Sequence, residues 1–224
     1  MNQLLAYHGN ATIKDQYLVR VRTHRTADQI LQRYAHYWHN GKGSAVGCTI
    51  HGKCFAAYRR KLGIPPLFAH AKEAIFEGLP PDIAKLWPEN FLEAIPVGAD
   101  LSQVWPQFVV WLLDDPKSGL SRFAETDANR ILINNVASLH RNQSTPSRKW
   151  RGAIADIGWT IHLYNLALMN PEVTAEPFHS FTAIMTVNFA CWARLNASDA
   201  AHVINYAAAT YGHAASDAVK AAGS

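Results

Sequence analysis

Long apolar runs are missing from this sequence of 224 residues. Although 49% of the residues are hydrophobic, no stretch approaches the roughly 18 uncharged apolar residues that a membrane span requires. The opening residues, MNQLLAYHG, also lack the basic region and the sustained apolar run of a secretory leader. The sequence therefore predicts a soluble cytoplasmic protein that does not have a membrane as its partner.

Cysteine and charge are sparse as well. The three cysteines are an odd number and too few for a disulfide framework, which fits a reducing compartment. Charged residues make up only 17% of the chain, and the net charge of +4 is spread along it without a block of one sign. Because a basic arm for nucleic acid would need such a block, we expect a macromolecular partner that is a protein, with nucleic acid as the weaker alternative.

Strand patterns are also few, and only residues 12–22 and 120–123 have the composition of a short strand. Apolar residues instead recur every three or four positions, as on one face of a helix. This spacing predicts helices over residues 10–38, 46–62, 67–77, 104–113, 131–139, 154–168, 181–195 and 198–211. Residues 79–95 contain three prolines and are expected to form only short turns of helix.

The predicted fold is therefore all-α, with about eight to nine helices in one compact domain and minor strand content possible in the first half. A polar linker over residues 141–147 separates a first region, residues 1–141, from the C-terminal helices of residues 142–224. Because the helices on both sides of the linker are amphipathic, we expect the two regions to pack together as one domain.

Several long phrases between residues 5 and 123 are distinctive: YHG, GKGSAVGCTIH, LGIP and IFEGLPPDIAKLWPENFLEAIPVGADLSQVWPQFVVWLL. In this order they resemble a family of bacterial and bacteriophage proteins without an established activity. The resemblance implies a shared module, and the presence of the family on mobile elements implies an accessory or anti-defence role. The family's loop has a cysteine where this chain has Ser44, so a role that needs two thiols is not expected here.

The glycine-rich segment of residues 41–51 is the expected functional surface, with Tyr7 and His8 folding back beside it. Glycine permits close approach of backbone amides to a ligand, and a lysine would add positive charge, so the candidate binding residues are Tyr7, Lys42, Gly43 and Gly47. The spacing matches neither a P-loop nor a dinucleotide-binding fingerprint. A plain connector between two helices therefore stays as the alternative.

The same segment contains candidate catalytic residues. Cys48 is expected near a helix N-terminus, where the helix dipole favours thiolate, and His51 or His8 would be the base. The alternative is a packed and inert cysteine, since free cysteine is among the most buried residue types. We also expect His24 to form a surface pair with Asp28, one helical turn away.

A metal centre would need other residues as well. The residues of zinc-compatible type are His36, His39, Cys48, His51 and Cys54, but their spacing is that of no known zinc finger. We therefore expect neither a metal nor a cofactor. The function predicted from the sequence is an accessory protein that binds a macromolecular partner, and the alternative is an enzyme or a binder of small anionic ligands that uses Cys48 and a histidine.

Overall fold

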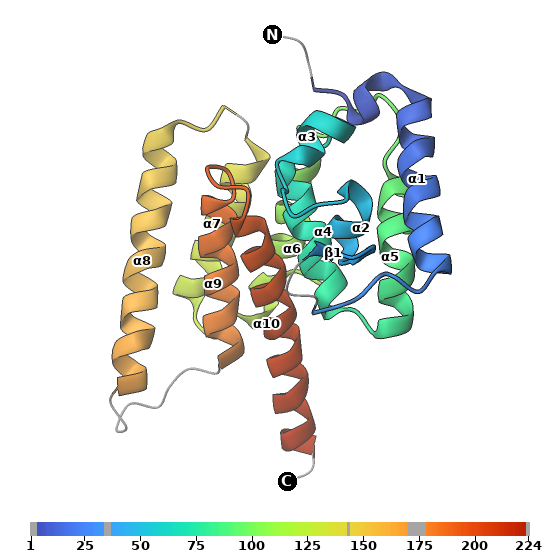
Figure 1. Ribbon diagram of the computed structural model, residues 1–224. Coiled ribbons are helices and arrows are strands. Elements are labelled where there is room, and N and C mark those ends of the chain that lie inside the picture. The colour runs from blue at the N-terminus through green and yellow to red at the C-terminus, as the bar shows by residue number, and fades with distance from the viewer. Residues whose placement is uncertain (1–3, 34–36, 143, 170–177, 223–224) are drawn as a thin grey trace. The chain divides into compact units, whose positions relative to one another are not determined.

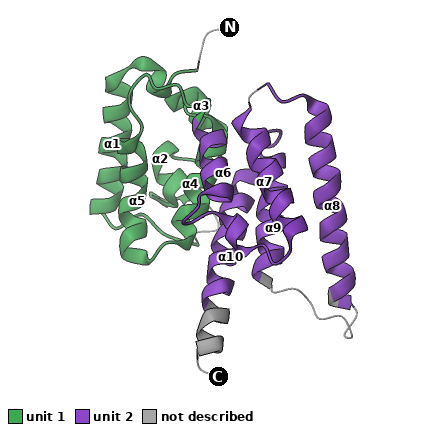
Figure 2. Cartoon of the chain, turned by 180° about the vertical axis from the view of Figure 1, so that it is seen from behind, with its two compact units in different colours: residues 1–103 green, residues 104–224 purple. Residues whose placement is uncertain are grey.

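The computed structural model describes residues 4–33, 37–142, 144–169 and 178–222 (Figure 1). Over these residues the protein is built from α-helices, two 3-10 helices and one two-stranded sheet. The all-α prediction with minor strand content in the first half is thus confirmed. The chain divides into two compact units, Met1–Gln103 and Val104–Ser224 (Figure 2). Within the described residues, none of the helices combines the length and the apolar composition that crossing a membrane requires.

Unit 1 packs its helices around two clusters of buried apolar side chains. Its elements are η1 Ala6–Gly9, α1 Ala11–Thr26, β1 Trp38–His39, β2 Lys42–Gly43, α2 Ala45–Ile50, α3 Ala57–Leu62, α4 Pro66–Gly78 and α5 Pro81–Ala94. The strands β1 and β2 are antiparallel, with Trp38 opposite Gly43. The short helix α2 is buried along its whole length, so it forms the centre of the unit.

The expected helix over residues 10–38 is wrong in its second half. Asn10 caps α1 as its side chain accepts a hydrogen bond from the Thr12 amide, but the helix ends at Thr26. Shortly after it, Asp28 and Arg33 adopt positive φ angles of 53° and 56°, which no α-helix contains. The chain then runs into the hairpin of β1 and β2, and Tyr34 lies outside the described residues.

The expected helix over residues 46–62 is divided in two. The first part, α2, ends where His51 takes a left-handed conformation with φ 50°. Two cations satisfy the last carbonyl groups of α2, since Arg20 Nη1 donates to Thr49 O at 2.9 Å and Lys61 Nζ donates to Ile50 O at 2.9 Å. The second part, α3, begins only at Ala57.

Residues 79–95, expected to form only short turns, contain the full helix α5. Pro81 occupies the first turn, where its missing N–H and fixed φ cost nothing. Pro88 lies inside the helix and loses one backbone hydrogen bond. Its ring is nevertheless buried on the same face as Ala84 and Leu92, and this packing outweighs the lost bond.

Unit 2 follows the predicted helices more closely. It contains α6 Val104–Asp114, η2 Leu120–Phe123, α7 Asp127–Arg141, α8 Ser147–Met169, α9 Phe178–Trp192 and α10 Asp199–Ala222. The two segments with strand-like composition are helical, residues 12–22 in α1, as the expected helix over residues 10–38 required, and residues 120–123 in η2. The linker of residues 141–147 joins α7 to α8 inside unit 2, and the division between the compact units falls at Gln103 and Val104.

Candidate functional site

The glycines of the predicted loop bring two backbone segments together. A Cβ atom at Gly43 or at Gly47 would lie less than 3.0 Å from the carbonyl oxygen of Tyr37. This oxygen also accepts a hydrogen bond of 2.8 Å from the Ser44 amide. The amides of the two glycines are engaged within the protein, since Gly43 N donates to Gln29 O at 2.9 Å and Gly47 N donates to the Ser44 hydroxyl at 3.2 Å. These glycines therefore have a packing role that the sequence did not reveal.

Cys48 is fully buried beside this junction. Its thiol donates to the carbonyl oxygen of Gly43 at 3.3 Å, and burial raises the pKa of the thiol to about 12. At neutral pH the group is protonated and out of reach of a substrate, which gives no support to a nucleophilic role. Burial likewise raises the pKa of the Cys191 thiol to about 12, whereas Cys54 is exposed.

The three thiols are expected to differ sharply in reactivity. In the native protein, iodoacetamide should modify Cys54 quickly and leave Cys48 and Cys191 unmodified, because only thiolates that reach the reagent react. Mass spectrometry of tryptic peptides, taken before and after unfolding in guanidinium chloride, measures this difference. Rapid modification of Cys48 in the folded protein would show an open, reactive thiol and would restore the enzymatic alternative.

Tyr7 and His8 anchor η1 to the rest of unit 1. Tyr7 is fully buried, and its hydroxyl donates to Leu92 O at 2.7 Å, while burial raises the pKa of the phenol. His8 is exposed, and its Nε2 lies 3.1 Å from the carbonyl oxygen of Arg60, so this nitrogen is the donor. The structure thus places His8 against α3, and the histidine that contacts His51 is His24.

His51 forms a hydrogen-bonded pair with His24. Their Nε2 atoms lie 2.7 Å apart, and His24 Nδ1 lies 2.6 Å from the side-chain oxygen of Gln29. Because that oxygen accepts, His24 carries its proton on Nδ1 and His51 donates to its Nε2. Partial burial of the ring, then the positive charge of Arg20, lowers the pKa of His51 to about 4, so the ring is neutral at pH 7.

The surface pair expected between His24 and Asp28 is not formed. Asp28 instead forms an ion pair of 2.7 Å with Lys85 of α5. Lys42, the predicted cation of the loop, is exposed, and its positive charge is close enough to help lower the pKa of Asp28, after the larger effect of Lys85. The positive charge of Lys42 therefore lies near the carboxylate of Asp28, which is already paired with Lys85.

Aromatic rings of unit 1 form two groups of contacting rings, one with His51 and one with Phe55, and we call the two groups together the aromatic cluster. Trp38 stacks on His51 with 4.3 Å between the ring centroids and 10° between the planes, and Phe55 stacks on His70 at 4.1 Å and 7°. Tyr37 meets Phe55 edge to face at 5.4 Å and is 37% exposed. The rings of His51 and Tyr37 are the exposed members, so the cluster reaches the surface of unit 1.

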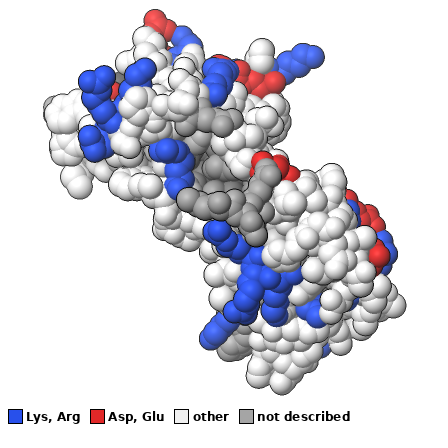
Figure 3. All heavy atoms as spheres, turned by 90° about the horizontal axis from the view of Figure 1, so that it is seen from above, with Lys and Arg blue, Asp and Glu red and all other residues white. Residues whose placement is uncertain are grey.

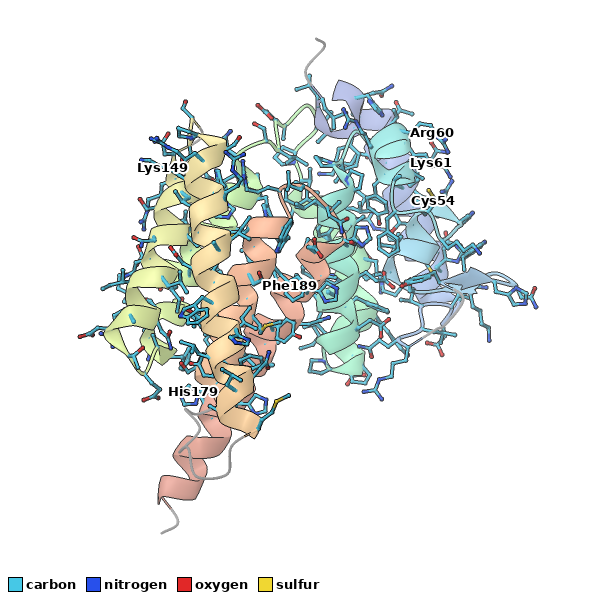
Figure 4. The ribbon with its side chains drawn as sticks, turned by 90° about the vertical axis from the view of Figure 1, so that its left-hand side faces the viewer. Cys54, Arg60, Lys61, Lys149, His179 and Phe189 are labelled. Atoms are coloured by element: carbon cyan, nitrogen blue, oxygen red, sulfur yellow. The ribbon has the colours of Figure 1, made fainter. Side chains whose placement is uncertain are left out.

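Four cations follow His51 in the chain, and we call them the basic flank: Lys53, Arg59, Arg60 and Lys61. The first three are exposed, and Lys61 is half-buried where it caps α2. None of the four takes part in the ion pairs formed by the described residues. Figure 4 shows Arg60 and Lys61 on one side of unit 1 with Cys54, and Figure 3 shows Lys and Arg side chains in several places on one face of the molecule.

The charge of the protein is unevenly divided between the units. Unit 1 contains twelve Lys and Arg against eight Asp and Glu, whereas unit 2 contains nine of each, so the entire net charge lies in unit 1. From Gln29 to Lys72 the chain has seven Lys and Arg and no Asp or Glu. This acid-free segment was readable from the sequence, but the expectation of evenly spread charge overlooked it.

A buried polar group lies beneath the site. The Nζ atom of Lys72 donates to Thr49 Oγ1 at 2.7 Å and to Tyr58 OH at 3.0 Å, and the lysine has no exposed surface. Burial lowers the pKa of Lys72 to about 7. The neighbouring carboxylate of Glu73 accepts a hydrogen bond of 2.8 Å from the Val46 amide, and burial raises its pKa. These groups hold the buried helix α2 in place.

The zinc-compatible residues proposed from the sequence lie in different surroundings. His36 lies outside the described residues, Cys48 points into the core, and Cys54 is exposed. Among the described residues, no three His, Cys, Asp or Glu side chains are grouped in a way that could hold a metal ion. The expectation that no metal is needed stays a prediction.

Comparisons of the chain with protein-family models, with curated proteins and with solved structures found no match. The resemblance to the bacterial and bacteriophage family therefore stays a prediction based on the quoted phrases. The features that indicate a function are the basic flank, the positive net charge of unit 1 and the aromatic cluster.

Proposed function

We propose that the protein is a nucleic-acid-binding protein and that the basic flank of unit 1 contacts the phosphates. The observation that carries the proposal is a set of cations, Lys53, Arg59 and Arg60, that form no ion pair with the carboxylates of the described residues. They lie in the unit that holds all of the net charge. Cations of this kind neutralise phosphates and release counterions, which supplies most of the sequence-independent affinity for nucleic acid.

The proposal keeps the binding role expected from the sequence and changes the preferred partner from protein to nucleic acid. Two features support the change. Lys and Arg are clustered along one acid-free segment, and exposed rings lie next to them. The interior of a protein interface is usually poor in lysine, so the exposed Lys53 fits a phosphate backbone better than the centre of a protein interface. Arg59 and Arg60 suit phosphate because a guanidinium group can donate two parallel hydrogen bonds to it.

The enzymatic alternative has less support. The Cys48 thiol is buried with a pKa of about 12, and the His51 ring is already engaged with His24. A cysteine nucleophile needs both access and thiolate character. The accessory or anti-defence role on mobile elements, and the cytoplasmic location, stay predictions, and binding of nucleic acid is compatible with both.

The proposal is tested by reversing the charge of the basic flank. The variant Lys53→Glu/Arg59→Glu/Arg60→Glu of the full chain should bind a fluorescein-labelled oligonucleotide at least ~10-fold more weakly than the wild type at about 100 mM salt. Its affinity should also depend less steeply on salt concentration, because fewer counterions are released. Fluorescence anisotropy titrations between about 50 and 200 mM salt measure both quantities.

The matched control is Arg148→Glu/Lys149→Glu/Arg151→Glu, which also reverses three exposed cations, here at the start of α8 in unit 2 (Figure 4 labels Lys149). We expect this control to keep most of the affinity. A competition with polyglutamate separates the two partner classes. If polyglutamate displaces the oligonucleotide at equal charge concentration, or if the flank variant binds as tightly as the wild type, the partner is not a nucleic acid held by this surface.

A further inference from the structure

We infer that the nucleic acid is single-stranded, with its phosphates on the basic flank and its unstacked bases on the aromatic cluster. This inference rests on the proposed function and names the form of nucleic acid that the same surface recognises. Proteins that bind single strands combine a positive surface along the backbone with rings on which successive bases stack. Both elements occur here within one short part of unit 1.

Rings and cations alternate along the chain after α2. His51 is followed by Lys53, then by Phe55, and then by the two arginines of α3. One cation of the flank also contacts the end of α2 beside His51, since Lys61 Nζ donates to the carbonyl of the preceding residue, Ile50, at 2.9 Å. We therefore expect a single nucleic-acid strand whose phosphates follow these cations to bring its bases next to the rings.

The rings are held in fixed positions, which lowers the entropic cost of binding. His51 is fixed by its hydrogen bond to His24 and by the parallel stack with Trp38. Phe55 lies between His70, on which it stacks, and the edge of Tyr37. A neutral histidine ring and a tyrosine ring at the surface each offer a flat apolar face to a base.

Duplex nucleic acid fits this surface less well. Its bases are paired inside the helix, so rings at the protein surface reach only the sugar and phosphate groups. The arginines of the flank are on α3, a helix of six residues that spans only about 9 Å and therefore offers a short element for groove reading. Stacking on the cluster is available only to bases that have left a duplex.

The experiment compares an oligothymidine of about 20 nucleotides with a duplex of the same length, using the full chain and the variants Tyr37→Leu and His51→Asn. Asparagine tolerates the left-handed backbone of His51, so the second variant removes the ring and keeps the turn. We expect the wild type to bind the single strand more tightly than the duplex. Each variant should weaken single-strand binding by about 5- to 100-fold and leave duplex binding unchanged.

The readouts separate failure of the inference from failure of the proposed function. If both ring variants bind the single strand as the wild type does, or if the wild type prefers the duplex, the stacking role is refuted while binding through the basic flank stands. If neither oligonucleotide binds, the proposed function fails as well. Thermal unfolding of each variant, compared with the wild type, shows whether a loss of binding reflects a loss of fold.

Discussion

Replacing Gly47 by alanine is expected to lower the free energy of unfolding by at least about 3 kcal/mol. The new Cβ would lie less than 3.0 Å from the carbonyl oxygen and the carbonyl carbon of Tyr37. Both are backbone atoms, so no rotation of a side chain can relieve the overlap. Either the hairpin of β1 and β2 or the helix α2 must move, and α2 is buried along its whole length.

Urea titrations followed by circular dichroism measure the loss. The matched control is Gly52→Ala, five residues further on, where an added Cβ would meet no atom within 4 Å. We expect this control to change the free energy of unfolding by less than about 1 kcal/mol. Equal stability of the two variants would contradict the packing role of Gly47 and would reopen the interpretation of the segment as a ligand-binding loop.

Gly47 also shows why the sequence pointed to a ligand-binding loop. A glycine that permits close approach of a ligand and a glycine that permits close approach of another backbone segment look identical in a sequence. The atom that Gly47 approaches is the backbone carbonyl oxygen of Tyr37. Residue identities do not show where a backbone atom lies. Only the folded chain shows that the approaching group is the protein itself.

The helices of unit 2 were predictable because local periodicity decides them. Residues 104–113 were expected to be helical, and α6 covers Val104–Asp114. Residues 27–33 and 37–44 were not predictable in this way, because non-glycine residues such as Asp28 and Asn40 adopt positive φ angles there. Such conformations cost energy locally and persist only because the surrounding contacts enforce them, so they cannot be read from local propensity.

Some features of the candidate site also follow from residue identities alone, whereas others depend on the tertiary fold. The acid-free segment from Gln29 to Lys72 is a property of the sequence and follows from residue identities alone. The pairing of His24 with His51 joins residues 27 positions apart on two elements, α1 and the end of α2, and needs the tertiary fold. The burial of Cys48 is an intermediate case, because residue type favoured burial but could not prove it.

The difference in free energy of unfolding between the wild type and the variant Lys72→Met is expected to change with pH. Between about pH 7 and pH 9 the wild type should gain about 2 kcal/mol of stability relative to the variant. Lys72 has no exposed surface, and burial lowers its pKa from 10.5 in the unfolded chain to about 7. Below pH 7 both states bind the proton, and the folded state contains a buried ammonium group. Between pH 7 and 10.5 only the unfolded chain binds it, so folding becomes more favourable as the pH rises.

Comparison with the variant is necessary because other buried groups make the protein less stable as the pH rises. The thiol of Cys48 has a pKa of about 12 when folded against 9.0 when unfolded, so it lowers stability above about pH 8.5 in both proteins and cancels in the difference. Lys85→Met is the control, because Lys85 is exposed on α5 and its ion pair with Asp28 raises its pKa. Urea titrations at several pH values should give a flat difference for the control and a rising one for Lys72. A flat difference for both would mean that Lys72 keeps its proton in the folded state, held by the oxygens of Thr49, Tyr58 and Ala45 that accept from it.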